Sequence, residues 1–188
     1  MDVQNDFCPG GKLPVSNGDS IVSLLNKYAI IFSNKKLPIF ASRDWHPKKT
    51  KHFKKFGGLW PEHCIQNTKG AQFNPKLKLP PETIIISKGM QPQQESYSAF
   101  QAVDSSGTEF VILLKFLGIN EIFLAGLATD YCVKWSVLDA LKSGLKTYLL
   151  LDAVKGVNIK PNDSEEAIKE MIAQGASIIT FEKVAKYL

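Results

Sequence analysis

The sequence contains few cysteines, and they lie far apart. Cys8, Cys64 and Cys132 are the three thiols of the 188-residue chain, and none belongs to a CxxC pair. Disulfide-stapled domains and cysteine-rich zinc modules need cysteines that are paired or closely spaced. We therefore exclude both classes and expect three free thiols.

Long apolar runs are also missing. No stretch approaches the roughly 20 apolar residues that a helix needs to cross a bilayer. The first residues, MDVQNDFCPGG, have neither the basic start nor the apolar run of a signal peptide. We interpret the chain as cytoplasmic and without a membrane partner.

Strong charge is lacking as well. The formal net charge is +5, and its most visible source is the stretch KKTKHFKK at 48–55. No recognition helix, RRM or zinc-finger pattern accompanies this stretch. We interpret it as a solvated face and expect no nucleic-acid partner.

The pattern that is present is an alternation of strands and helices. Apolar runs at 37–42, 83–87, 121–126, 146–152 and 176–181 have the continuity of strands buried on both faces. Helical patterns lie at 19–35, 108–118, 131–144 and 163–175, and the last three end at a glycine. This alternation predicts an α/β fold, a doubly wound and mostly parallel sheet between helices in three Rossmann-like layers. A chain of this length fits one domain, 1–188.

The segment at about 45–81 breaks the alternation. It is rich in lysine, glycine, proline and histidine and has no long periodic element. So long an irregular insertion in a compact domain is usually functional. We expect it to carry part of a site.

Cys132 follows the apolar run at 121–126 and begins a helical pattern. Reactive groups gather at the carboxyl ends of parallel strands. With Thr129 as the N-cap, the first helical turn would present free N–H groups, which favour a thiolate and can hold an oxyanion. A buried, inert core thiol is the alternative interpretation.

Two charged residues occupy comparable positions. Lys88 directly follows the apolar run at 83–87, and Asp2 lies in DVQNDF at the start. A carboxylate acts as a base toward a thiol only if its own charge is stabilised, and a nearby lysine does this. A surface lysine and a solvated terminal carboxylate are the alternatives.

SRDWHP suggests a metal site. On an extended segment Asp44 and His46 project to the same face, and His63 in WPEHC can supply a third ligand. Two imidazoles and one carboxylate suit Zn²⁺, Fe²⁺ or Mn²⁺. For His52 we favour a role behind the ligands or at the surface. Each histidine taken alone is more often structural.

Three aromatic residues lie near these groups in sequence. Phe7, Trp60 and Tyr97 can hold a flat ring between them, although aromatic residues in loops are also commonly just packing.

Six stretches together resemble the nicotinamidase branch of the isochorismatase-like cysteine hydrolases. DVQNDF, SRDWHP, GGLWPEHCIQNTKGAQF, the lysine of SKG, ESYSAF and GLATDYCV occur in that family's order and approximate spacing, over nearly the whole chain. GLATDYCV with WPEHC is specific for the amidase branch, because isochorismatases proper lack the nucleophilic cysteine. The resemblance implies an amidohydrolase that converts nicotinamide to nicotinate and ammonia through a cysteine thioester, in NAD salvage. It leaves self-association open.

The resemblance also implies a role for individual residues. It implies a catalytic triad of Asp2, Lys88 and Cys132, and an oxyanion hole formed by the Ala128 and Cys132 N–H groups, with a cis peptide bond between Leu127 and Ala128. It implies one divalent metal ion, zinc before iron or manganese, bound by Asp44, His46 and His63. It also implies a site for the substrate ring that is lined by Phe7, Trp60 and Tyr97.

One departure from the family concerns the start of the fold. Family members carry an apolar strand immediately before the aspartate of DVQNDF, whereas this sequence starts at Met1. Either the sequence omits residues upstream of Met1, or the first strand is truncated. If the strand is missing, we expect Asp2 to be poorly held and to be the weakest assignment of the triad.

Three other functions are compatible with parts of the pattern. A sister amidase would act on another small amide, such as a pyrazinamide-like ring, carbamoylsarcosine or ureidoacrylate. An oxygenase can use two histidines and one carboxylate, but such sites usually lie in β-barrels. A catalytically silent binding module would fit a missing strand.

Overall fold

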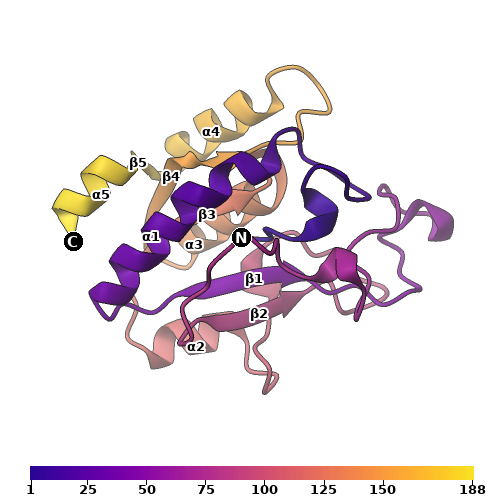
Figure 1. The fold of residues 1–188 in the computed structure, drawn as a ribbon, viewed down its shortest axis with the longest axis horizontal. Helices are drawn as coiled ribbons and strands as arrows, with labels where there is room; N and C mark the ends of the chain where they lie inside the picture. Colours follow the sequence, from indigo (N-terminus) through magenta and orange to yellow (C-terminus); the bar gives the residue numbers. More distant parts are fainter.

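Five strands form two parallel sheets in the computed structural model, which describes residues 1–188 (Figure 1). The strands are β1 (Phe40–Asp44), β2 (Ile84–Lys88), β3 (Glu121–Leu127), β4 (Lys146–Lys155) and β5 (Ser177–Ile179). β1 pairs with β2, and β3, β4 and β5 pair in that order, every pair being parallel. The predicted α/β class, with parallel strands flanked by helices, is confirmed.

Five α-helices accompany the strands. They are α1 (Val22–Asn34), α2 (Phe110–Phe116), α3 (Lys134–Lys142), α4 (Asp163–Ala173) and α5 (Phe181–Tyr187). The first four fall within the predicted helical patterns, whereas α5 was not predicted. None of these helices combines the length and the apolar character that crossing a membrane requires.

β4 shows why its sequence is continuously apolar. Leu149 packs with Val133 and Val137 in one core cluster, while its neighbours Tyr148 and Leu150 pack in another. Successive side chains of a strand point to opposite faces, so both faces of β4 are covered. In Figure 1, α1 crosses one face of the β3–β4 pair and α3 lies behind it.

The helix ends were predicted correctly at one terminus only. Gly118, Gly144 and Gly175 follow α2, α3 and α4 and have positive φ angles of 66°, 79° and 110°. This is the left-handed backbone conformation in which many α-helices end. The predicted N-cap was wrong, because Thr129 is the first residue of a π-helical turn rather than its cap.

The insertion at 45–81 contains no strand or α-helix, only short 3₁₀ turns and isolated bridges to the rest of the chain. Within it, the five lysines of 48–55 are all exposed, but His52 and Phe53 between them are buried. The same short stretch therefore faces water on one side and the protein interior on the other.

Met1 lies between the two sheets, where β1 and β3 do not pair with each other (Figure 1). Its amino group donates to Ala125 O at 2.7 Å, and its carbonyl accepts from Leu127 N at 3.0 Å. On the other side Asp2 N–H donates to Ser42 O at 3.1 Å. Met1 and Asp2 also line a cavity of about 500 Å³ that lies between the strands of the two sheets. Met1 and Asp2 thus connect β3 to β1 through backbone hydrogen bonds.

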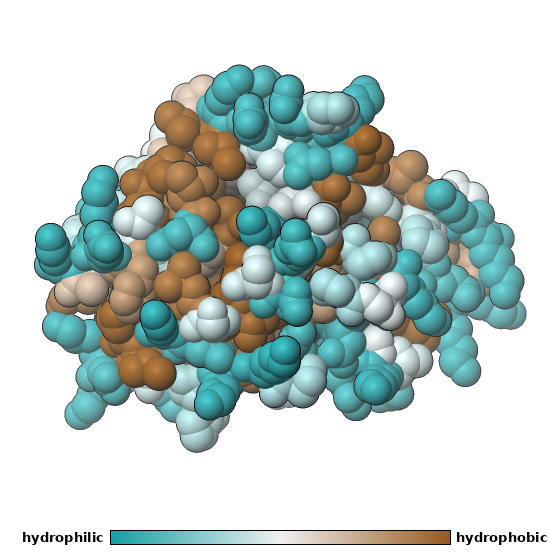
Figure 2. All heavy atoms as spheres, turned by 45° about the horizontal axis from the view of Figure 1, so that its top comes forward, coloured by the Kyte–Doolittle hydropathy of each residue, from teal (hydrophilic) through white to brown (hydrophobic).

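The surface is mixed in character. Figure 2 shows hydrophobic side chains gathered in the left half of one face, the half that holds α1 and α5 in Figure 1, while the right half is mainly hydrophilic. Large exposed apolar side chains include Phe116 and Ile30, which are 86% and 57% exposed.

The two-sided burial of β4 predicts the effect of truncating its side chains. Leu149→Ala should lower the free energy of unfolding by about 2–5 kcal/mol, because Leu149 is fully buried. Leu151→Ala, two residues along the same strand but 39% exposed, is the matched control and should cost less than about 1 kcal/mol. Urea unfolding measures both. Equal losses would contradict this account of the core.

Candidate active site

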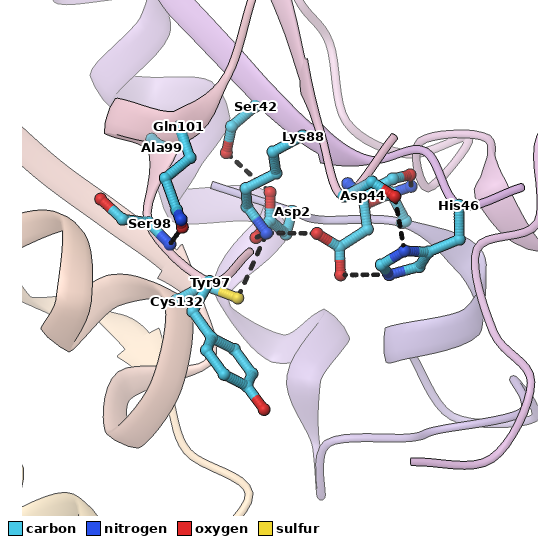
Figure 3. Close-up of polar contacts among 12 residues, drawn as sticks. Asp2, Ser42, Asp44, His46, Lys88, Tyr97, Ser98, Ala99, Gln101 and Cys132 are labelled. Atoms are coloured by element: carbon cyan, nitrogen blue, oxygen red, sulfur yellow. Dashed lines mark hydrogen bonds and ion pairs between the residues drawn. The ribbon is translucent and has the colours of Figure 1, made fainter. Parts of the chain in front are cut away.

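Lys88 brings together three side chains that are far apart in the sequence (Figure 3). Its Nζ lies 3.0 Å from Asp2 Oδ2 and 3.4 Å from Cys132 Sγ. All three residues are buried, and none is more than 7% exposed. The structure therefore places the predicted acid, amine and thiol in one cluster.

A second carboxylate shares the same lysine. Asp44 is paired in register with Lys88 at the ends of β1 and β2, and its Oδ1 also binds the Lys88 ammonium. Burial on its own would lower the pKa of Lys88, but Asp2 and Asp44 outweigh it and raise the pKa well above its ordinary value. Lys88 is therefore a permanent cation, and it joins the triad to Asp44.

Asp2 is held more firmly than expected. Only 1% of it is exposed, and Ser42 Oγ donates to Asp2 Oδ1 at 2.7 Å in addition to the backbone bond described above. The expectation that Asp2 is poorly held is wrong, because β1 supplies contacts that do not depend on a preceding strand.

Cys132 lies in the π-helical turn Thr129–Val133, which follows β3 directly. Burial raises the pKa of the Cys132 thiol well above its ordinary value, and the nearby Lys88 opposes this shift only in part. The sulfur is thus a thiol at neutral pH and needs a base to become a nucleophile. Asp2 is the carboxylate in position to accept its proton.

The peptide bond between Leu127 and Ala128 is cis, as the resemblance implied. Ala128 N–H donates to no carbonyl or side chain of the protein. Ala128 and Cys132 also line the same pocket. The Ala128 N–H is therefore free to bind an oxygen atom beside the sulfur.

Three histidine side chains gather on the other side of Asp44. His46 Nε2 and His63 Nε2 lie 3.4 and 3.7 Å from Asp44 Oδ2. One ring nitrogen of each of His46, His52 and His63 lies within 4.8 Å of the others. His52 is only 3% exposed, which rules out the surface alternative for it and leaves a role behind or beside the ligands.

The chemistry of this cluster fits a metal ion. His46 Nδ1 and His63 Nδ1 are turned toward the carbonyls of Gly89 and Pro61, at 3.0 and 2.8 Å, which directs both Nε2 atoms inward. His46 Nε2 is buried without a hydrogen-bond partner. Burial, and then the charge of His46, lower the pKa of His52 to about 3, so its imidazole is neutral, as a ligand must be.

Asp44 carries the negative charge of the cluster. Burial alone would raise the pKa of Asp44, but Lys88 and the two histidine rings outweigh it and hold the pKa well below its usual value. A carboxylate with imidazoles around it is a ligand set for zinc and neighbouring transition metals.

Two residues of DVQNDF that sequence reasoning missed support this cluster. The Gln4 side chain donates to Asp44 O and accepts from Asp44 N, both at 2.8 Å. Asp6 Oδ2 accepts from the N–H of Cys64, the residue after His63, at 2.7 Å. Both Gln4 and Asp6 are buried, and apolar periodicity does not reveal polar residues that face inward.

The pocket beside the sulfur is mostly aromatic and aliphatic. Trp60 Nε1 donates to the Tyr97 hydroxyl at 2.9 Å, and Phe7 lies 5.4 Å from the His63 ring. Tyr131, not predicted, packs edge-on to Trp60 at 4.9 Å. The lining consists of Phe7, Leu13, Val15, Asp44, His52, Trp60, His63, Tyr97, Leu127, Ala128, Tyr131, Cys132 and Val157. All three predicted ring-site residues are among them.

Comparisons with known proteins agree with this geometry. The isochorismatase domain model matches residues 1–183. The nicotinamidase of Escherichia coli (strain K12) is 39% identical over 198 residues, covering 96% of this chain and 92% of that protein. A crystal structure of the Pyrococcus horikoshii pyrazinamidase in complex with zinc is 46% identical, covers 96% of both chains and has a TM-score of 0.88. A structure from L. infantum in complex with nicotinate is 31% identical, with a TM-score of 0.79, over 95% of this chain and 89% of that one.

The histidine cluster predicts the effect of removing a ligand. His46→Ala should weaken zinc binding by at least ~100-fold, because even partners outside the ligand shell contribute 10- to 100-fold. Zinc per chain, measured after dialysis, reports the loss, and Cys132→Ala is the control that should keep its zinc. Undiminished zinc in the His46 variant would remove this residue from the ligand set.

Proposed function

Since the chain belongs to the isochorismatase domain family, we propose that its triad hydrolyses nicotinamide to nicotinate and ammonia. The enzyme is an amidohydrolase that acts on a linear carboxamide C–N bond. The observation that carries the proposal is the position of the Lys88 ammonium between Asp2 and Cys132, beside an aromatic pocket that also contains Asp44 and His63.

The first half of the reaction forms a thioester. Asp2 takes the proton of the Cys132 thiol, and the thiolate attacks the carboxamide carbon. The N–H groups of Ala128 and Cys132 hold the oxyanion of the tetrahedral species. Asp2 then returns the proton to the amide nitrogen, so ammonia leaves and the acyl group stays on sulfur.

The second half uses the same groups on water. Asp2 takes a proton from a water molecule, and the resulting hydroxide attacks the thioester carbon. The C–S bond breaks, Asp2 returns its proton to the sulfur to regenerate the Cys132 thiol, and the acid leaves and loses its own proton to solvent as nicotinate. The Lys88 ammonium lies 3.0 Å from Asp2 Oδ2 and balances the charge of that carboxylate in both halves of the reaction.

Asp44, His46 and His63 would hold the metal ion, with His52 beside them. The bound ion supplies a Lewis acid for the pyridine nitrogen of the substrate. Zinc fits two or three imidazoles and a carboxylate best, with iron or manganese as alternatives. The zinc complex of the P. horikoshii pyrazinamidase supports this choice.

The aromatic side chains would orient the ring. Phe7, Trp60 and Tyr97 line the pocket, and the Trp60–Tyr97 hydrogen bond fixes two of them relative to each other. Holding the ring from its faces brings the carboxamide to the sulfur in one orientation.

The other functions raised by the sequence are not favoured. The relatives named above as nicotinamidases and pyrazinamidases match the chain over almost its full length. An oxygenase has no use for a thiol, a lysine and a carboxylate in mutual contact. We also propose that the product enters pyridine nucleotide salvage, within a single domain working in the cytoplasm, where thiols stay reduced.

Replacing the nucleophile tests the mechanism. Cys132→Ala should reduce ammonia release from nicotinamide by at least ~1,000-fold, because no other group can form the thioester. Cys8→Ala is the matched control, since Cys8 is buried but does not line the pocket. Ammonia release by a coupled assay measures both. Turnover that survives in the Cys132 variant would refute the nucleophile.

Removing the metal tests how the ring is held. Treatment with a chelator should raise the KM for nicotinamide by at least ~10-fold, and added zinc should restore it. Benzamide lacks the ring nitrogen, so it should be a poor substrate of the untreated enzyme and insensitive to the chelator. A KM for nicotinamide that does not change after metal removal would contradict the proposed binding mode.

A further inference from the structure

Ser42 lies at the base of the triad and has no part in the mechanism described so far. It is two residues before Asp44 on β1, so both side chains project to the same face of the strand. Asp44 is in register with Lys88 on β2. Ser42 is 3% exposed. A hydroxyl this deeply buried next to a functional carboxylate calls for a partner, and it has one.

Ser42 forms two hydrogen bonds with Asp2. Its carbonyl accepts the Asp2 backbone N–H at 3.1 Å, and its hydroxyl donates to Asp2 Oδ1 at 2.7 Å. The hydroxyl makes no other hydrogen bond in the protein. Figure 3 shows this contact on one side of the carboxylate and Lys88 on the other.

The two oxygens of Asp2 are therefore not equivalent. Oδ1 is taken by the Ser42 hydroxyl, whereas Oδ2 lies 3.0 Å from Lys88 Nζ as an ion pair and accepts no hydrogen bond. Because the Ser42 hydroxyl engages Oδ1, Oδ2 is the oxygen of Asp2 that is left free to exchange a proton with the thiol.

We propose that Ser42 is a positioning residue that fixes the rotation of the Asp2 carboxylate and reserves Oδ2 for the proton exchanged with Cys132 and the leaving ammonia. This inference rests on the proposed function. The geometry that carries it is the pair of contacts between one serine and both ends of Asp2.

Lys88 cannot provide this orientation by itself. Its ammonium is a compact charge on a flexible stem, and it is shared with Asp44. Ser42, in contrast, is fixed by the β1–β2 pairing. Loss of its hydroxyl leaves the charge of Asp2 balanced but lets the carboxylate rotate, so proton transfer slows while the groups that bind the ring are untouched.

The test compares two side chains of the same shape. Ser42→Thr keeps the hydroxyl, and Ser42→Val replaces it with a methyl group of similar size. We expect the valine variant to lose roughly 10- to 100-fold in kcat for nicotinamide. Its KM and its zinc content should stay within about threefold of wild type, and the threonine variant should recover most of the lost kcat.

Ser87→Ala is the matched control. Ser87 is a buried serine on the neighbouring strand β2, whose hydroxyl accepts a hydrogen bond from Arg43 rather than contacting Asp2. The Ser87→Ala variant measures the effect of removing a buried hydroxyl that does not contact Asp2, and its kcat should stay within about threefold of wild type. Ammonia release by the wild-type enzyme, lost in Cys132→Ala, establishes the proposed function independently of any Ser42 result.

The outcomes separate cleanly. A valine variant with the kcat of the threonine variant would overturn the inference, as would a valine variant whose loss appears in KM or in zinc content. If neither variant folds, Ser42→Ala decides. A reduced kcat with an unchanged KM supports the positioning role, and a kcat within about threefold of wild type overturns it.

Discussion

The rest of the site depends on one buried cation shared by two carboxylates and a thiol. An isolated ammonium inside a protein is expensive, and it stays charged only where opposite charges surround it. Asp2 and Asp44 surround Lys88, and its Nζ also lies next to the Cys132 sulfur. Removing any one partner changes the balance for the others, so the three charged groups and the thiol form one electrostatic unit.

This sharing connects two chemistries that look separate in the sequence. Asp44 binds the lysine through Oδ1 and faces His46 and His63 through Oδ2. Asp44 therefore links the histidine cluster to the triad. The parallel pairing of β1 and β2 produces this arrangement, because it places Asp44 and Lys88 opposite each other at the strand ends. Gln4 holds the same backbone point from the other side.

Much of this arrangement could be predicted from the sequence, because apolar runs reveal the strands and reactive side chains can be recognised where those runs end. Lys88 ends one apolar strand, Cys132 lies in the turn that follows another, and His46 follows Asp44 at the spacing of an extended segment. Ser42 and Gln4 could not be found in this way, since their importance lies in hydrogen bonds to residues about 40 positions away. The sharing of Lys88 by Asp44 escaped for the same reason, because register between strands is not written in either strand alone.

The stretch 48–55 has a further consequence. Its lysines are solvated, but His52 and Phe53 between them are buried next to the cluster. The stretch has no strand or α-helix to anchor it, and segments of this kind open locally at a lower free energy than the whole domain. An opening that only lifts this loop from the body would carry His52 away from His46 and His63. The histidine cluster then depends on the local stability of one surface loop as well as on the stability of the sheet beneath it.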